Sequence, residues 1–151
     1  MISAGGGRVG RPLLEEAIER LNGTPMKAIA GPLMPDEDFE ALRTRAPRNV
    51  ELIRSVPDLA HELRSAAASI SQCGYNTALD VVRARVPALV VPYATPEEDE
   101  QTRRARRLEQ LGLVRVSDRV DATMLDFEPA AASLDLSGAE TTRDLLYELI
   151  A

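Results

Sequence analysis

Residues 71–82 have the sequence SQCGYNTALDVV, which joins an apolar segment directly to a helical pattern. The segment before it, AAASI, has the composition of a buried strand, and the residues from Tyr75 onward have the spacing of an amphipathic helix. The junction contains Cys73, Gly74 and Asn76 in place of ordinary loop residues. A strand that leads directly into a helix is the repeating unit of parallel α/β sheets, so this stretch indicates the fold class.

The same alternation of short apolar runs and amphipathic stretches continues along the chain. It predicts an α/β fold with a parallel sheet of about six strands and short connections, many of them marked by proline. The expected strands are Ile2 to Ala4, Met26 to Ala30, Val50 to Ile53, Ala68 to Ser71, Ala88 to Val91 and Val114 to Val116. The expected helices are Arg11 to Leu21, Asp36 to Arg45, Asp58 to Ser65, Tyr75 to Ala84, Asp99 to Leu111, a short one near Asp121 to Leu125, and Gly138 to Ile150.

Composition limits the classes of function. A chain of 151 residues is the size of one domain, so residues 1–151 are expected to form a single unit. No apolar run approaches the roughly 18 residues that a membrane-spanning helix needs. The formal charge of -6 repels polyanions, which makes nucleic acid an unexpected partner.

Cysteine and histidine each occur once, as Cys73 and His61. One cysteine cannot form an intrachain disulfide, and the chain does not start with a signal peptide, so we expect a reducing, cytoplasmic location. Zinc sites and histidine-dependent nucleophiles need several converging side chains. Neither a metal site nor a catalytic triad is therefore expected in this chain, and no cofactor or catalytic residue is assigned to it.

The loop after the first expected strand is rich in glycine. Gly5, Gly7 and Gly10 satisfy the pattern GxGxxG, in which glycine lets the backbone approach a phosphate at a helix N-terminus. A dinucleotide site also needs an acidic residue at the end of the second strand, and residues 31–33 are Gly-Pro-Leu, so NAD is disfavoured. Two interpretations stay open: a site for another phosphate ligand, or a turn that only permits close packing of strand and helix.

The junction at residues 71–82 offers a second set of polar groups. Asn76 and Asp80 are four residues apart and share a helix face, and Thr77 adds a hydroxyl in the first turn. A carboxylate at Asp80 suits a ribose diol, because its oxygens can accept from neighbouring hydroxyls. The alternative is that Asn76 and Thr77 cap the helix and Asp80 complements its dipole.

The loop TPEEDEQ, residues 95–101, leads into another expected helix. Its acidic residues are typical of a helix start, whereas the amide of Gln101 can both donate to and accept from a pair of sugar hydroxyls. Leu108 and Leu111 mark the inner side of this helix. The arginines that precede them, Arg103, Arg104, Arg106 and Arg107, are expected to form a solvated face.

Three segments, SAGGGRVG, SISQCGYNTALDVV and VPALVVPYATPEEDEQTRRARRLEQLGL, together resemble a known family over nearly the whole chain. They are similar to the C-terminal half of GT-B glycosyltransferases of family 28, the type of the bacterial lipid II-forming N-acetylglucosaminyltransferase. The resemblance implies a Rossmann-like, three-layer αβα domain that binds a nucleotide sugar, usually a UDP sugar.

The resemblance also implies a role for individual residues. Asp80, where the family commonly has Glu, would bind the ribose, and the backbone of Val56 would contact the base. Glu100 and Gln101 would bind the donor sugar. Tyr75 is bulkier than the small residue that the family often has. The residues implied to bind the donor phosphates are Gly5, Gly6, Gly7, Gly10, Gly74, Asn76 and Thr77.

In such enzymes the acceptor site and any general base lie in the N-terminal half. The expected first strand begins at Ile2, so we expect this chain to be the donor half of a longer enzyme, or a separate subunit as in the two-chain dolichol-linked N-acetylglucosaminyltransferases. Alone it would be inactive, and membrane association would be peripheral, through the missing half. An apolar stripe on the expected helix Gly138 to Ile150 could promote self-association.

Other functions fit the same pocket. The enzymatic alternative is a nucleotide-sugar hydrolase, or an epimerase of similar architecture, since the same pocket can serve water as the acceptor. A sensor or interaction domain would keep the fold and lack the chemistry, although an intact Asp80 and Gln101 argue against that function.

Overall fold

Six parallel strands form one sheet in the computed structural model, which describes residues 1–131. The order across the sheet is β3-β2-β1-β4-β5-β6, so β1 and β4 are neighbours although 65 residues of sequence separate Ser3 from Ser69. The strands are β1 (Ile2–Ser3), β2 (Met26–Ile29), β3 (Val50–Ile53), β4 (Ser69–Ser71), β5 (Ala88–Val90) and β6 (Arg115–Val116).

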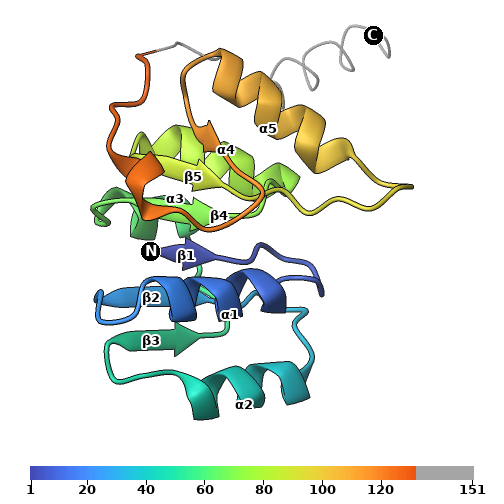
Figure 1. Ribbon diagram of the computed structural model, residues 1–151, viewed down its shortest axis with the longest axis vertical. Helices are drawn as coiled ribbons and strands as arrows, with labels where there is room; N and C mark the ends of the chain where they lie inside the picture. The colour runs from blue at the N-terminus through green and yellow to red at the C-terminus, as the bar shows by residue number, and fades with distance from the viewer. Residues whose placement is uncertain (132–151) are drawn as a thin grey trace, which may run out of the picture.

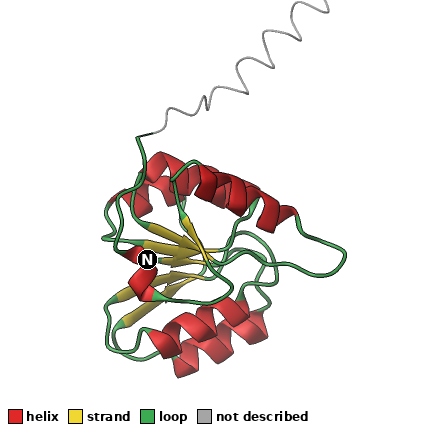
Figure 2. Cartoon of the chain, turned by 45° about the horizontal axis from the view of Figure 1, so that its top comes forward, coloured by secondary structure: helices red, strands yellow, loops and turns green. Residues whose placement is uncertain are grey.

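Helices cover both faces of this sheet (Figures 1 and 2). They are α1 (Arg11–Arg20), α2 (Asp36–Arg45), α3 (Leu59–Arg64), α4 (Tyr75–Ala84), α5 (Glu100–Gln110) and the short 3₁₀ helix η1 (Ala122–Leu125). The result is the three-layer, Rossmann-like αβα architecture that the resemblance implied.

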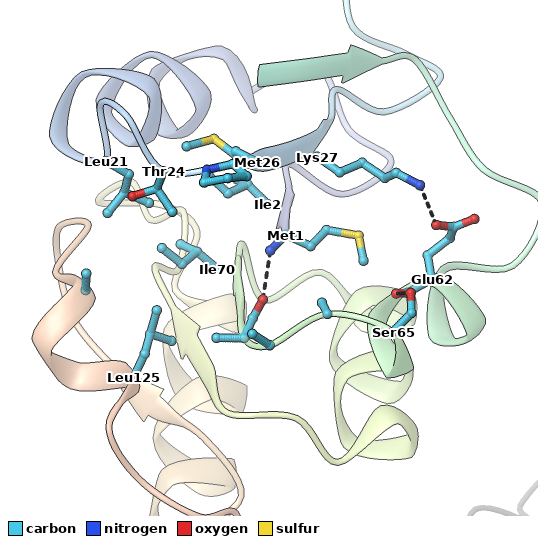
Figure 3. A pocket seen from close by; sticks show the side chains of 15 residues that line it. Met1, Ile2, Leu21, Thr24, Met26, Lys27, Glu62, Ser65, Ile70 and Leu125 are labelled. Carbon is cyan, nitrogen blue, oxygen red and sulfur yellow. Dashed lines mark hydrogen bonds and ion pairs between the residues drawn. The ribbon is translucent and has the colours of Figure 1, made fainter. Parts of the chain in front are cut away.

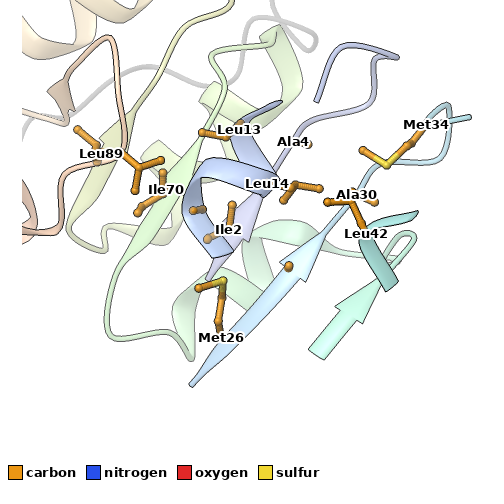
Figure 4. Packing of buried hydrophobic residues seen from close by; sticks show 13 residues of the cluster. Ile2, Ala4, Leu13, Leu14, Met26, Ala30, Met34, Leu42, Ile70 and Leu89 are labelled. Carbon is orange, nitrogen blue, oxygen red and sulfur yellow. The ribbon is translucent and has the colours of Figure 1, made fainter. Parts of the chain in front are cut away.

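The core divides into two apolar clusters because side chains alternate across a strand. On β5, Leu89 belongs to the cluster that packs under α1 and α2, whereas Ala88 and Val90 belong to the one under α3, α4 and α5. Figure 4 shows the first cluster, in which Leu14 of α1 and Leu42 of α2 contact the sheet. Both leucines are almost completely buried.

The predicted elements agree with the structure to within one residue at most ends. Two helices, α2 and α4, and strand β3 have the predicted bounds. The largest differences are at α3 and α5, each one residue shorter than predicted at both ends, whereas β1, β2, β4, β5, β6, α1 and η1 are one residue shorter at a single end. The predicted helix Gly138 to Ile150 lies outside the described residues.

This topology determines where a ligand site can form. The chain runs from β1 outward to β3 and then crosses back to β4, so the order reverses between β1 and β4. In open α/β sheets, ligands bind beyond the carboxyl ends of the strands at such a reversal. The loops after β1, β4 and β5 lie together at that edge, on the right of Figure 1.

Candidate functional site

The loops after β1 and β4 are joined at the reversal point. Ser3 pairs with Ser71 in the parallel ladder, and the backbone amide of Gln72 donates to the carbonyl of Ser3 at 3.3 Å. The side-chain amide of Gln72 donates to the carbonyl of Val9 at 3.2 Å, in the glycine loop. Gln72 is buried and was not among the predicted site residues, although its place directly after β4 could have indicated it.

Three of the four predicted glycines in this loop face open space or α4. Gly5 has a φ of +73°, and a Cβ there would lie 3.4 Å from the hydroxyl of Thr77. Gly6 and Gly7 are exposed, and a Cβ on either would meet no atom within 4 Å. Backbone in this part of the loop is therefore accessible to a ligand, next to the start of α4.

Gly10 has a different environment. It is buried, and a Cβ on it would lie 2.2 Å from the Cβ of Ala4. Close packing of α1 against the end of β1 accounts for this glycine, as one of the two interpretations allowed. Contact of Gly10 with a phosphate stays a prediction.

The N-terminus of α4 has no side-chain cap. Gly74 is its N-cap residue, and no side chain bonds to the free amides of the first turn. Asn76 is exposed and Thr77 is buried beside Gly5, so neither acts as the capping residue that the alternative proposed. The first turn contains no acidic residue. The positive end of the helix dipole is thus open to an anion.

Asp80 lies one turn further along α4, near the loop after β3. Burial raises the pKa of Asp80 above its ordinary value; Arg83 opposes this shift and the nearby Asp58 adds to it. Asp58 caps α3 by accepting from the backbone amide of His61 at 2.9 Å. Val56 is two residues before Asp58 in the loop after β3, and its contact with a base stays a prediction.

The start of α5 is bonded to the loop that precedes α4. The side-chain oxygen of Gln101 accepts from the backbone amides of Cys73 and Tyr93, at 3.0 and 3.2 Å. Arg104 donates to the carbonyl of Cys73 at 2.6 Å and to the carboxylate of Glu100. Of the two predicted sugar-binding residues, Gln101 thus contacts the residue before the N-cap of α4, and Glu100 is connected to it through Arg104.

The prediction that the four arginines of α5 form a solvated face is wrong for Arg104. Arg103 has a side chain that is 74% exposed and Arg106 one that is 59% exposed, as expected. Arg104 is only 21% exposed because it turns toward Cys73. Helical spacing alone did not reveal this, since the partner is a backbone carbonyl 31 residues away.

A separate pocket of about 380 Å³ lies at the opposite edge of the sheet, beside the amino ends of β1, β2 and β4 (Figure 3). Met26, Ile70 and Leu125 line it, and the ion pair between Lys27 and Glu62, at 2.8 Å, lies on its wall. None of the predicted donor-site residues lines this pocket.

Residues 1–131 contain neither a candidate metal cluster nor a candidate membrane-spanning helix. No group of three or more histidine, cysteine, aspartate or glutamate side chains in that range could hold a metal ion. None of the helices found there has the length and apolar character needed to cross a membrane.

Comparison with known families identifies the domain. Residues 28–138, more than two thirds of the chain, match the model of the glycosyltransferase family 28 C-terminal domain. The chain belongs to this family. The match includes α4 and the start of α5, so the family 28 domain contains both helix starts described above. The predicted family and fold are confirmed.

Solved glycosyltransferases share the fold. VinC, solved in complex with DTDP, is 22% identical and has a TM-score of 0.54 over 99% of this chain and 33% of its own. MurG of Acinetobacter baumannii is 21% identical, with a TM-score of 0.58 over 99% of this chain and 41% of its own. The spinosyn rhamnosyltransferase SpnG is 25% identical, with a TM-score of 0.56 over 83% of this chain and 32% of its own.

The chain thus spans about a third to two fifths of the length of these solved proteins. No curated protein sequence matches it.

Proposed function

We propose that residues 1–151 form one donor-binding unit of a glycosyltransferase, which holds a nucleoside diphosphate sugar, UDP-linked, at the reversal point of the sheet. The observation that carries the proposal is that residues of two other segments converge on the uncapped start of α4. Gly5 lies against it, Gln101 and Arg104 bind the residue before it, and Asp80 continues its face.

The diphosphate would bind at the start of α4. Free amides of a first turn and the positive end of a helix dipole together favour an anion, and no side chain competes for them here. The exposed Gly6 and Gly7 would let the backbone approach from the opposite side. Asn76 is exposed at the same point and can donate to a phosphate oxygen.

The nucleoside would extend toward the loop after β3. The carboxylate of Asp80 can accept from two neighbouring ribose hydroxyls, whereas deoxyribose offers only one of them. The backbone of Val56 would contact the base. This arrangement favours a ribonucleotide, and we propose uridine diphosphate, although the fold-level relative VinC was solved with DTDP.

The donor sugar would lie near the start of α5. The side-chain oxygen of Gln101 already accepts from two backbone amides, so its NH₂ group is the part left to donate to a sugar oxygen. Glu100 is held by Arg104 and could accept from a hydroxyl with its remaining lone pairs.

Transfer would need a second, acceptor-binding unit, in cis or in trans. The solved relatives are two to three times as long as this chain, which leaves room in them for such a unit. We propose that this second unit supplies the acceptor site and the general base. Any membrane association would be peripheral and would be made by the second unit. The proposed location is cytoplasmic.

Calorimetric titration of the purified chain tests the donor proposal. UDP-N-acetylglucosamine and UDP should bind, dTDP should bind more weakly, and NAD should not bind. Asp80→Asn should weaken UDP binding about tenfold to a hundredfold, because it removes a hydrogen bond to a charged group. Asp118→Asn makes the same chemical change at an exposed residue of the β6 side and should leave affinity unchanged.

The result that contradicts the proposal is equal affinity for NAD and UDP, or no binding of any nucleotide. Slow release of free sugar from UDP-N-acetylglucosamine by the chain alone would instead favour the hydrolase alternative.

A further inference from the structure

Two side chains of α5 hold the peptide units on either side of Cys73. Gln101 accepts from the Cys73 amide, and Arg104 donates to the Cys73 carbonyl. Cys73 itself is completely buried, and Gly74, the N-cap residue of α4, follows it directly. The orientation of the chain at the start of α4 is therefore determined from α5.

The Arg104 bond determines the direction of one amide in particular. The Cys73 carbonyl and the Gly74 N–H belong to the same planar trans peptide, so they point in opposite directions. Arg104 holds the carbonyl toward α5, and the Gly74 N–H consequently points away from α5. Within residues 1–131 this amide has no hydrogen-bond partner, so it is free for a ligand.

The rest of the guanidinium is also engaged. It is paired with Glu100, and it lies over the ring of Tyr75 with its central carbon 5.6 Å from the ring centroid. A lone cation near the positive end of α4 would be unfavourable, and the pair with Glu100 offsets that charge. Arg104 thus connects the first residue of α4 with the first residue of α5.

We propose that Arg104 is a positioning residue of the donor site, which acts through the Cys73 carbonyl to aim the Gly74 amide at the donor diphosphate. The inference rests on the proposed function. It goes beyond the family's donor contacts, since Arg104 touches no ligand in this scheme and acts only through the backbone of its partner residue.

The direct test measures UDP affinity of the full chain with Arg104→Met and Arg104→Lys. The matched control is Arg103→Met, because Arg103 makes the same kind of pair, with Asp99 four residues earlier, on the exposed face of the same helix. We expect Arg104→Met to weaken UDP binding about tenfold or more, the size expected for a hydrogen bond to a charged group. Arg104→Lys should recover part of the loss, and Arg103→Met should bind as the unaltered chain does.

Affinity is compared for the folded protein, well below each melting temperature. A purely structural Arg104 would lower the melting temperature and leave UDP affinity unchanged, and that result overturns the inference. Full affinity in Arg104→Lys would also overturn it, because a single ammonium cannot reproduce the geometry of the guanidinium.

Hydrogen exchange separates this inference from the proposed function. In Arg104→Met the backbone amide of Cys73, on the residue whose carbonyl Arg104 binds, should exchange faster than in Arg103→Met, while that of Ala28 in β2 should not change. If the unaltered chain binds no nucleotide, the proposed function fails, and the role of Arg104 in donor binding fails with it. Equal exchange at Cys73 in both variants would show that Arg104 does not hold the loop at all.

Discussion

At the scale of single residues, Asp80 occupies a position that does not favour its own charge. Its pKa is raised mainly by burial and further by Asp58. The folded protein therefore binds its proton more tightly than the unfolded chain does, and the free energy of unfolding falls as the pH rises from 3.8 through the raised pKa. A carboxylate at a position that disfavours its charge does not add to stability at neutral pH. Binding of a ligand explains its presence better.

Asp80→Asn should consequently leave the free energy of unfolding at pH 7 unchanged or higher, while UDP binding weakens. Chemical denaturation at pH 7 and pH 4 checks the stability part, and Asp118→Asn is the control. A clear loss of stability at pH 7 would show instead that Asp80 supports the helix dipole.

Gly10 is expected to matter for packing. Gly10→Ala places a Cβ against Ala4 where only 2.2 Å is available, so we expect a loss of about 1 to 3 kcal/mol in the free energy of unfolding. Gly7→Ala has open space around its Cβ and should change stability by less than about 0.5 kcal/mol. Equal melting temperatures for the two variants would contradict this description of the loop.

Cys73 should be unreactive in the folded protein. It is completely buried, and burial raises its pKa to about 11, while Arg104 acts in the opposite direction. Little thiolate forms at pH 8, so iodoacetamide should label the folded chain far more slowly than the chain in denaturant. Mass spectrometry after timed labelling measures both rates; comparable rates would show that the loop before α4 is open.

At the scale of elements, the sequence pattern predicted most helices and strands because each combines a clear periodicity with a recognisable end. Helix α4, for example, begins after Gly74 and has the predicted bounds. The order of strands was not predicted, since β1 and β4 pair through contacts distant in sequence. The role of Arg104 was missed for the same reason: its partner lies in another element.

The C-terminal end of α4 offers a test of an individual element. Arg85, the C-cap residue, has a left-handed conformation with φ 55° and ψ 36°, which is unfavourable for a residue with a Cβ. Arg85→Gly should raise the free energy of unfolding by about 0.5 to 1 kcal/mol. Arg83→Gly, inside the last turn, should lower it by about 1 kcal/mol. Denaturant titration measures the free energy of unfolding of both variants. A change in the same direction for both would contradict the left-handed conformation of Arg85.

At the scale of the whole molecule, donor binding and sugar transfer should be separable. The isolated chain should bind UDP-N-acetylglucosamine and show no transfer. Addition of an acceptor-binding half from a family 28 enzyme, fused or separate, should be required for turnover, because a general base contributes about 100-fold to 10,000-fold and positioning of the acceptor contributes more. A transferase assay with and without that half checks this; robust transfer by the isolated chain would contradict it.

The most direct test of the donor site is to map which residues of the folded chain a nucleotide sugar perturbs. Two-dimensional NMR of the ¹⁵N-labelled protein, titrated with UDP-N-acetylglucosamine, reports each backbone amide separately. We expect the largest shifts at the loop after β1, at Gly74 and the first turn of α4, and at Val56 and Gln101. Shifts confined to the pocket around Met26 and Ile70 at the opposite edge, or the same shifts with NAD, would contradict the account.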